Sequence, residues 1–167
     1  RAQSRSLSYS NILDLTHTLH GRFPSFNPNF FPPFSRRPFV TIEKNGFYGN
    51  IISYWEHSGT HMDAPGHFVK GTWTVDQIPA ARLIAPAVVI HIHERAMNNT
   101  DAQVTPDDLR TWEDRYGRIP AGAVVFMHSG WESRVNDEAS YRNADSGGAM
   151  HFPGFHPEAA AMLVKDR

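Results

Sequence analysis

The chain of 167 residues contains no cysteine, which excludes several kinds of chemistry at once. Without thiols the protein has no disulfides, no thiolate metal site and no cysteine nucleophile. The same absence leaves the compartment open, cytoplasmic or exported, because there is no cysteine pattern to report on it. The chain begins with Arg1 and not with Met, so we expect the start of the gene product to be absent, through a removed export signal or an edited sequence.

Long apolar runs and an excess of one charge are also missing. The longest apolar run covers residues 83–90 and contains Pro86, whereas a membrane-spanning helix needs about 20 apolar residues. Lys and Arg together number 16 and Asp and Glu number 17, for a net charge of −1. Nucleic acids and anionic membranes require clustered positive charge, so we expect neither as a partner.

Apolar and aromatic residues, by contrast, are plentiful. Apolar residues make up 40% of the chain and charged residues 20%, which is typical of a folded protein. We predict a single domain over residues 1–167, with a flexible, serine-rich segment at 1–12. The ten histidines supply neutral nitrogen ligands that titrate near neutral pH, and they direct attention to a metal site.

Residues 23–39 combine five prolines with six phenylalanines. This composition forbids a helix and predicts an extended arm. The arm either packs on the core as plain surface or has a more specific role. It could form a wall of an aromatic substrate pocket, or be exchanged with a neighbouring subunit.

The remaining sequence predicts strands mixed with a few helices, hence an α/β or α+β fold. Strands are expected at 39–43 and 48–55, joined by a turn at Asn45-Gly46, and at 87–93 and 123–127, where continuous apolar character suggests burial on both faces. Thr105 caps a helix that runs to about Tyr116, and a second helix extends from Pro157 to the end. Residues 136–156 are expected to form a long loop.

The segment 57–68, HSGTHMDAPGHF, contains four candidate metal ligands. In a helix Asp63 would lie about 200° around from His61. In a strand His57 and Asp63 would be roughly 20 Å apart, whereas ligands of one metal lie within about 2.0–2.2 Å of it. The segment must therefore fold back on itself, and Gly59 and the Pro65-Gly66 pair supply the bends.

Such a loop gathers His57, His61 and Asp63, a donor set that suits Zn²⁺, Mn²⁺ or Fe²⁺ with positions left open for water. His67 follows the Pro-Gly turn as a fourth ligand or as a nearby acid/base. The competing interpretation is that these histidines only hydrogen-bond a tight loop. Thr60 is a plausible orienting partner for the ligands.

This twelve-residue string resembles the signature of the cyclase-like metal-dependent hydrolase family, of the bacterial kynurenine formamidase and isatin hydrolase type. The resemblance extends to four further segments: residues 12–19, 74–79, 123–131 and 152–167. It implies an α/β fold of the swivelling β/β/α type, with a mixed sheet, flanking helices and assembly into homo-oligomers. It also implies that His57, His61 and Asp63 bind a divalent metal, Zn²⁺ or Mn²⁺, and that His67 is catalytic.

One departure concerns the end of the chain. The formamidases complete a two-metal centre with a further His and Glu beyond the matched region. The last helix is still amphipathic and uncapped at Arg167, so we expect the C-terminal part to be absent; a mononuclear site is the alternative.

The expected function is hydrolysis of an amide, lactam or lactone by metal-activated water, with a small aromatic amide or lactam such as an aryl formamide or isatin as substrate. Two alternatives stay open: a non-catalytic metal- or ligand-binding protein, and a cyclase or dehydratase that acts on a polyketide-like acid.

The other histidines carry weaker expectations. His91 and His93, on one strand face, are expected to be structural or on the surface, and His128 and Trp131 to pack or to border the pocket. His151 and Phe152 belong to a lid or a plain loop, and His17 receives no role.

Overall fold

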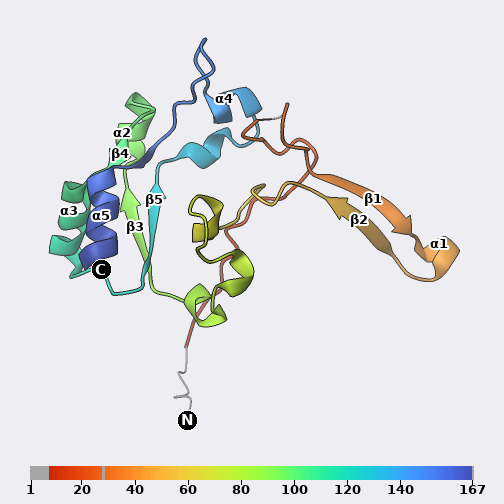
Figure 1. Cartoon of the computed structure of the whole chain (residues 1–167), viewed down its shortest axis with the longest axis horizontal. Coiled ribbons are helices and arrows are strands. Elements are labelled where there is room, and N and C mark those ends of the chain that lie inside the picture. The colour runs from red at the N-terminus through yellow and green to blue at the C-terminus, as the bar shows by residue number, and fades with distance from the viewer. Residues whose placement is uncertain (1–7, 28, 167) are drawn as a thin grey trace.

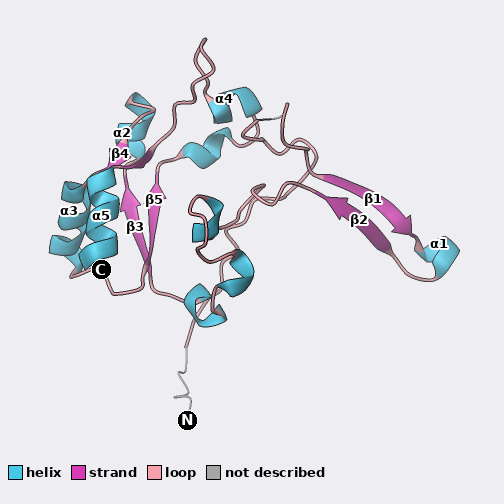
Figure 2. Cartoon of the chain, in the orientation of Figure 1, coloured by secondary structure: helices cyan, strands magenta, loops and turns pink. Residues whose placement is uncertain are grey.

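The computed structural model describes residues 8–27 and 29–166. Residues 1–7 of the predicted flexible segment lie outside the described part, and residues 8–12 form no helix or strand. Figure 1 shows helices gathered around short strands at one side of the molecule and a long hairpin projecting at the other. Between them lies a region built mostly of loops and short turns, which includes the 57–68 segment (Figure 2).

A parallel pair of strands forms the centre of the helical side. Strand β3 (Ala87–His91) pairs with β5 (Val124–His128), so that Val88 lies opposite Val125 and His91 opposite His128. A second, shorter parallel pair joins β4 (Gln103–Val104) to β6 (Gly154–Phe155). Helices α2 (His93–Asn98), α3 (Pro106–Tyr116) and α5 (Pro157–Asp166) lie on this side as well.

The hydrophobic core lies between these strands and helices. Alternate residues of β3 are buried, because successive side chains of a strand point to opposite faces. The buried apolar residues are Val88, Ile90, Ile92, Ala96, Ala102, Val104, Leu109, Ile119 and Ala159. The opposite face of β3 is exposed, so the prediction that this strand is covered on both faces is wrong for the described chain.

Helix α3 begins as the sequence predicts. The Thr105 hydroxyl accepts a hydrogen bond from the Asp108 amide, and the Asp108 carboxylate accepts one from the Thr105 amide at 2.7 Å. Arg95 of α2 adds two hydrogen bonds to the same carboxylate, at 2.7 and 3.2 Å. Gly117 ends the helix, and α5 begins at Pro157, both as predicted.

The projecting hairpin consists of β1 (Ser35–Val40) and β2 (Gly49–Ser53), paired antiparallel. Strand β1 lies a few residues earlier than the strand predicted at 39–43. Strand β2 ends sooner than the strand predicted at 48–55. Residues 42–45 form one helical turn, α1 (Ile42–Asn45), which Gly46 closes with a φ of 77°. The predicted Asn45-Gly46 turn is thus part of a longer connection. Within the described residues the Pro-rich arm forms no helix, as predicted, but it turns where the Phe31 amide donates to the Asn27 carbonyl, so it is not extended throughout. Its last residues belong to β1.

Two other boundaries differ from the prediction. The strand expected at 87–93 ends at His91, because the chain turns into α2 at His93. The loop expected at 136–156 contains α4 (Glu138–Arg142), a bridge between Ala144 and Met150, and β6. The chain is therefore a mixed α/β structure, but its strands form two-stranded sheets where one mixed sheet was expected. Among the described residues, no helix has the length and apolar character needed to cross a membrane.

Candidate metal centre and aromatic cavity

The 57–68 segment folds back on itself as its glycines and proline predict. Gly59 adopts a φ of +76°, and Pro65–His67 forms a single 3₁₀ turn, η1. The Gly66 amide donates to the Trp73 carbonyl at 2.8 Å, and a Cβ on Gly66 would also lie 2.8 Å from that oxygen. The close approach of the two backbones therefore requires glycine at this position.

This fold brings His57, His61 and Asp63 together. Asp63 Oδ1 lies 2.6 Å from His57 Nδ1 and 3.2 Å from His61 Nε2, so both imidazoles face the same carboxylate oxygen. One potential ligand atom from each residue falls within 4.8 Å of the other two. The convergence that neither a helix nor a strand could produce is therefore achieved by the loop.

The backbone fixes the orientation of His61. Its Nδ1 lies 2.9 Å from the Gly59 carbonyl, to which only a protonated ring nitrogen can donate. The Nε2 atom, which faces Asp63, then carries the lone pair of the neutral ring. Metal-binding histidines are commonly held in this way, with the second nitrogen donating to a carbonyl.

The neighbouring histidines favour the ionised form of Asp63. Burial raises the pKa of its carboxyl, but the hydrogen bond from His57 and the nearby His57, His61 and His67 rings outweigh it. The pKa is therefore held below its ordinary value of 3.8. An ionised carboxylate beside two imidazoles is a donor set for a divalent cation.

His67 lies directly beside this group. Its ring centroid is 3.9 Å from that of His57, with the ring planes tilted by 40°. Thr60, expected to orient a ligand, instead accepts a hydrogen bond at 3.1 Å from the His17 amide. His17 thus contributes its backbone, which attaches the N-terminal segment to the loop.

A cavity of about 370 Å³ opens against the 57–68 loop. His57, Gly59 and His61 form one wall. The other lining residues come from the Pro-rich arm, from the end of β5 and from the segment after it: Phe23, Pro24, Phe26, Met127, Ser129, Trp131, Tyr141, Arg142, Met150, Phe152 and Pro153. The structure thus places the arm in an aromatic cavity wall, while its exchange with a neighbouring subunit stays a prediction.

Arg142 is the cavity residue that sequence reasoning missed. It ends α4, and its Nε atom is buried without a hydrogen-bond partner among the described residues. The Trp131 indole, which donates to the Tyr141 carbonyl at 2.9 Å, fixes the neighbouring wall. Trp131 borders the pocket, as one of its two interpretations had it, whereas His128 is not among the lining residues. Phe152, expected in a lid or a plain loop, lines the pocket as well. No motif marked Arg142, because a lone arginine in a polar segment has no sequence signature.

The other histidines fall into two groups. His151 holds the loop after α4, because its Nδ1 lies 2.9 Å from an Asp101 carboxylate oxygen and its Nε2 lies 3.6 Å from one of Asp145. The Asp101 carboxylate raises the pKa of His151, and Asp145 raises it further by a smaller amount. His91, His93 and His128 form a separate cluster at the ends of β3 and β5.

Comparison with known proteins places this geometry in a family. Residues 13–167 match the family model Cyclase, described as "Putative cyclase". The chain belongs to the cyclase family. The match includes the 57–68 loop and nearly all of the described structure, so the resemblance noted from the motif is confirmed.

Two curated proteins are similar in sequence to this cyclase-family chain. The isatin hydrolase of Roseibium aggregatum is 38% identical over 125 residues, which are 72% of this chain and 47% of the relative. Cyclase-like protein 1 of Arabidopsis thaliana is 25% identical over 129 residues, which are 74% of this chain and 44% of the relative. The chain thus spans about half the length of the curated relatives it matches.

Solved structures of isatin hydrolases share the fold. Isatin hydrolase A from Ralstonia solanacearum superposes with a TM-score of 0.82 and 37% identity, over 93% of this chain and 62% of that one. An isatin hydrolase bound to the product analogue thioisatinate superposes with a TM-score of 0.81 and 32% identity, over 91% of this chain and 62% of that one. The isatin hydrolase A of Labrenzia aggregata bound to benzyl benzoate superposes with a TM-score of 0.81 and 36% identity, over 93% of this chain and 63% of that one.

Proposed function

We propose that this cyclase-family chain is part of a metal-dependent hydrolase that cleaves the amide or lactam bond of a small aromatic substrate. One observation carries the proposal. Ring nitrogens of His57 and His61 meet the same oxygen of Asp63, and both histidines form a wall of an aromatic cavity. Similarity to isatin hydrolases in sequence and in fold supports the same reaction class.

His57, His61 and Asp63 are the residues that would hold the metal. Two imidazoles and an ionised carboxylate fit Zn²⁺ or Mn²⁺ and are too rich in nitrogen for Ca²⁺ or Mg²⁺. When bound, such an ion polarises a substrate carbonyl and lowers the pKa of water toward about 7. The Gly59 carbonyl keeps the His61 ring in the tautomer that directs Nε2 toward the site.

His67 is proposed to move the proton. Hydrolysis of an amide takes a proton from the attacking water and delivers one to the leaving nitrogen. His67 stacks against His57 outside the triad of potential ligand atoms, so its imidazole is close to the site yet free to exchange a proton. An imidazole titrates near neutral pH and can perform both transfers.

The cavity defines the proposed substrate class. Phe23, Phe26, Trp131 and Phe152 supply aromatic walls on the sides away from the metal-binding loop. The Arg142 guanidinium belongs to the same lining and offers donors for a substrate carbonyl or carboxylate. Isatin and N-formylkynurenine, and simpler aryl formamides, combine a flat ring with such groups.

A turnover assay tests the proposal. Purified protein loaded with Zn²⁺ or Mn²⁺ is incubated with isatin, aryl formamides and simple lactones, and products are identified by mass spectrometry. We expect hydrolysis of at least one aromatic amide or lactam, abolished by His61→Ala and retained in a His20→Gln control, whose imidazole lies in neither histidine cluster. Metal-loaded protein that hydrolyses none of these compounds contradicts the proposal, and a dehydrated or cyclised product would indicate a cyclase.

The projecting hairpin supports the homo-oligomer that the family resemblance implies. Phe39, Phe47, Ile52 and Tyr54 on or beside β1 and β2 are all more than half exposed. We propose that a second copy covers this surface and that the fold is of the swivelling β/β/α type. Light scattering should give a mass above one subunit, and Ile52→Lys should lower it; a monomeric wild-type protein contradicts the assembly.

A further inference from the structure

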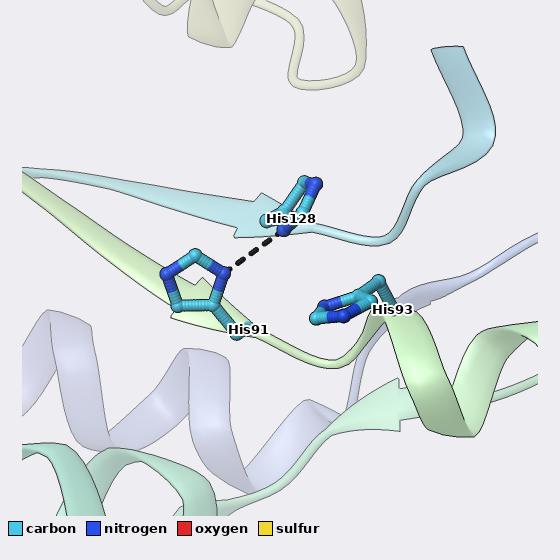
Figure 3. Close-up of side chains that lie close together, drawn as sticks. All are labelled: His91, His93 and His128. Carbon is cyan, nitrogen blue, oxygen red and sulfur yellow. Dashed lines mark hydrogen bonds between the residues drawn. The ribbon is translucent and has the colours of Figure 1, made fainter. Parts of the chain in front are cut away.

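Three imidazoles from three elements meet away from the 57–68 loop. His91 ends β3, His93 begins α2 and His128 ends β5. Figure 3 shows the three rings side by side in the gap between the strand ends and the first turn of α2. The ring centroids of His91 and His93 lie 5.0 and 4.9 Å, respectively, from that of His128.

The parallel ladder produces this convergence. His91 and His128 are register partners, so their side chains leave the two strands on the same face. The Ile92 amide then donates to the His128 carbonyl at 3.0 Å, which holds the chain close to β5 as it turns into α2. His93 follows directly, and Gly130 lies against it, with its Cβ position 3.6 Å from the His93 Cβ.

Hydrogen bonding within this group is incomplete. Nδ1 of His91 lies 2.9 Å from Nδ1 of His128, so one ring donates and the other accepts. His93 Nδ1 is buried and has no hydrogen-bond partner among the described residues. Buried polar atoms in proteins nearly always have a partner, and an ion or a water is the partner where no protein group reaches the atom.

We propose that His91, His93 and His128 form a second metal site, distinct from the His57–His61–Asp63 centre. One nitrogen from each ring lies within 4.8 Å of the other two. At a Zn–N distance of about 2.0–2.1 Å, three ligands of one ion lie within roughly 3.5 Å of each other, which small ring rotations supply here. The ion takes the place of the hydrogen bond between His91 and His128, and the ring that donated it then carries its proton on Nε2, so all three imidazoles stay neutral.

The donor set selects the metal. Three neutral imidazoles suit Zn²⁺, Cu²⁺ or Ni²⁺, whereas Mg²⁺ and Ca²⁺ require oxygen ligands. Glu132 lies beside the cluster, with Oε1 3.8 Å from His128 Nε2, where a carboxylate can orient a metal-bound imidazole. His91 is exposed, which leaves solvent access for a fourth ligand such as water.

The site lies apart from the aromatic cavity. Met127, the neighbour of His128 in β5, lines the cavity, and adjacent strand residues point to opposite faces. A metal bound by the three histidines would therefore connect the ends of β3 and β5 to α2 without entering the reaction site. We assign it the role of a structural clamp.

Metal stoichiometry tests the inference. Chelator-treated protein is titrated with Zn²⁺ by calorimetry and dialysed for elemental analysis, with Mg²⁺ as a comparison. We expect two Zn²⁺ per wild-type chain, one in His61→Ala, one in His128→Gln, and none when both substitutions are combined. The His20→Gln control should bind as the wild type does.

The two proposals fail separately. If wild-type protein binds one Zn²⁺ that His128→Gln removes and His61→Ala does not, the clamp stands and the catalytic centre is wrong. Equal Zn²⁺ binding by wild type and His128→Gln overturns the clamp. Because His128→Gln could lose Zn²⁺ through misfolding, His91→Gln serves as a second variant, and circular dichroism shows whether each variant is folded. NMR of the histidine rings in His61→Ala adds a direct measure, because Zn²⁺ must shift the signals of all three cluster residues; unchanged signals overturn the site.

Discussion

Nδ1 of His57 lies 2.6 Å from Oδ1 of Asp63, although the two residues are six positions apart in a stretch that contains no strand. Gly59, with a φ of 76°, turns the chain between these two residues, and the Pro65–His67 turn follows shortly after Asp63. The proposed metal centre therefore depends on the shape of one loop as much as on its ligands.

Substitution of His61 should remove the metal from this loop. In His61→Ala the Nε2 atom that faces Asp63 is lost, so Zn²⁺ affinity at this centre should fall by more than the roughly 10–100-fold typical of losing an outer partner. Elemental analysis after dialysis measures the loss, and turnover should disappear with the metal. Full metal retention at this centre would show that His61 is not a ligand.

Substitution of His67 should separate chemistry from metal binding. His67→Ala removes the imidazole that stacks on His57 but none of the three converging ligand atoms. Metal content should stay unchanged while kcat falls by about 10²–10⁴-fold, the usual contribution of a general acid/base. Loss of metal from this variant would instead make His67 a ligand.

Gly66 should tolerate no side chain. A Cβ there would lie 2.8 Å from the Trp73 carbonyl oxygen, so Gly66→Ala must push apart two backbones that are joined by a hydrogen bond. We expect a loss of about 1–3 kcal/mol in unfolding free energy and weaker metal binding, measured by denaturant titration and calorimetry. Gly154→Ala is the matched control, since nothing lies within 4 Å of its Cβ position. Equal effects of both substitutions would contradict the crowding argument.

The two acids in the first turn of α3 should differ in importance. Asp108 binds Arg95 and the Thr105 amide, so Asp108→Ala should lower the unfolding free energy by about 2 kcal/mol. Asp107 is exposed and, within the described part of the chain, pairs with Arg110 of its own helix, so Asp107→Ala should change the unfolding free energy by less than about 0.5 kcal/mol. Similar losses in both variants would contradict this assignment.

The Asp108 contribution should also depend on pH. Burial raises the pKa of Asp108, but Arg95 and Thr105 outweigh burial and hold the pKa below its ordinary value of 3.8. The stabilisation is therefore fully present above pH 3.8 and is lost as the pH falls through the lowered pKa. Denaturant titration of wild type and Asp108→Ala should show the difference shrinking below that pH; a constant difference would contradict the linkage.

Local chemistry allowed parts of the fold to be predicted. Thr105, Pro106 and Asp108 mark the start of α3, because a cap needs only neighbouring residues. The 57–68 segment could be recognised as a folded-back loop, since its ligand types and bends lie within twelve residues. The strand ending at His91, by contrast, was predicted too long, because periodicity does not show where β5 stops supporting it.

The amino-acid sequence by itself determined the donor set of the 57–68 loop, because the donors and the bends that gather them are all local. Only the tertiary structure placed Arg142 in the cavity and brought together His128 and His91, which lie 37 positions apart in the chain. Those two relationships depend on strand register and on the packing of separate segments, which arise when distant parts of the chain bury their apolar faces together.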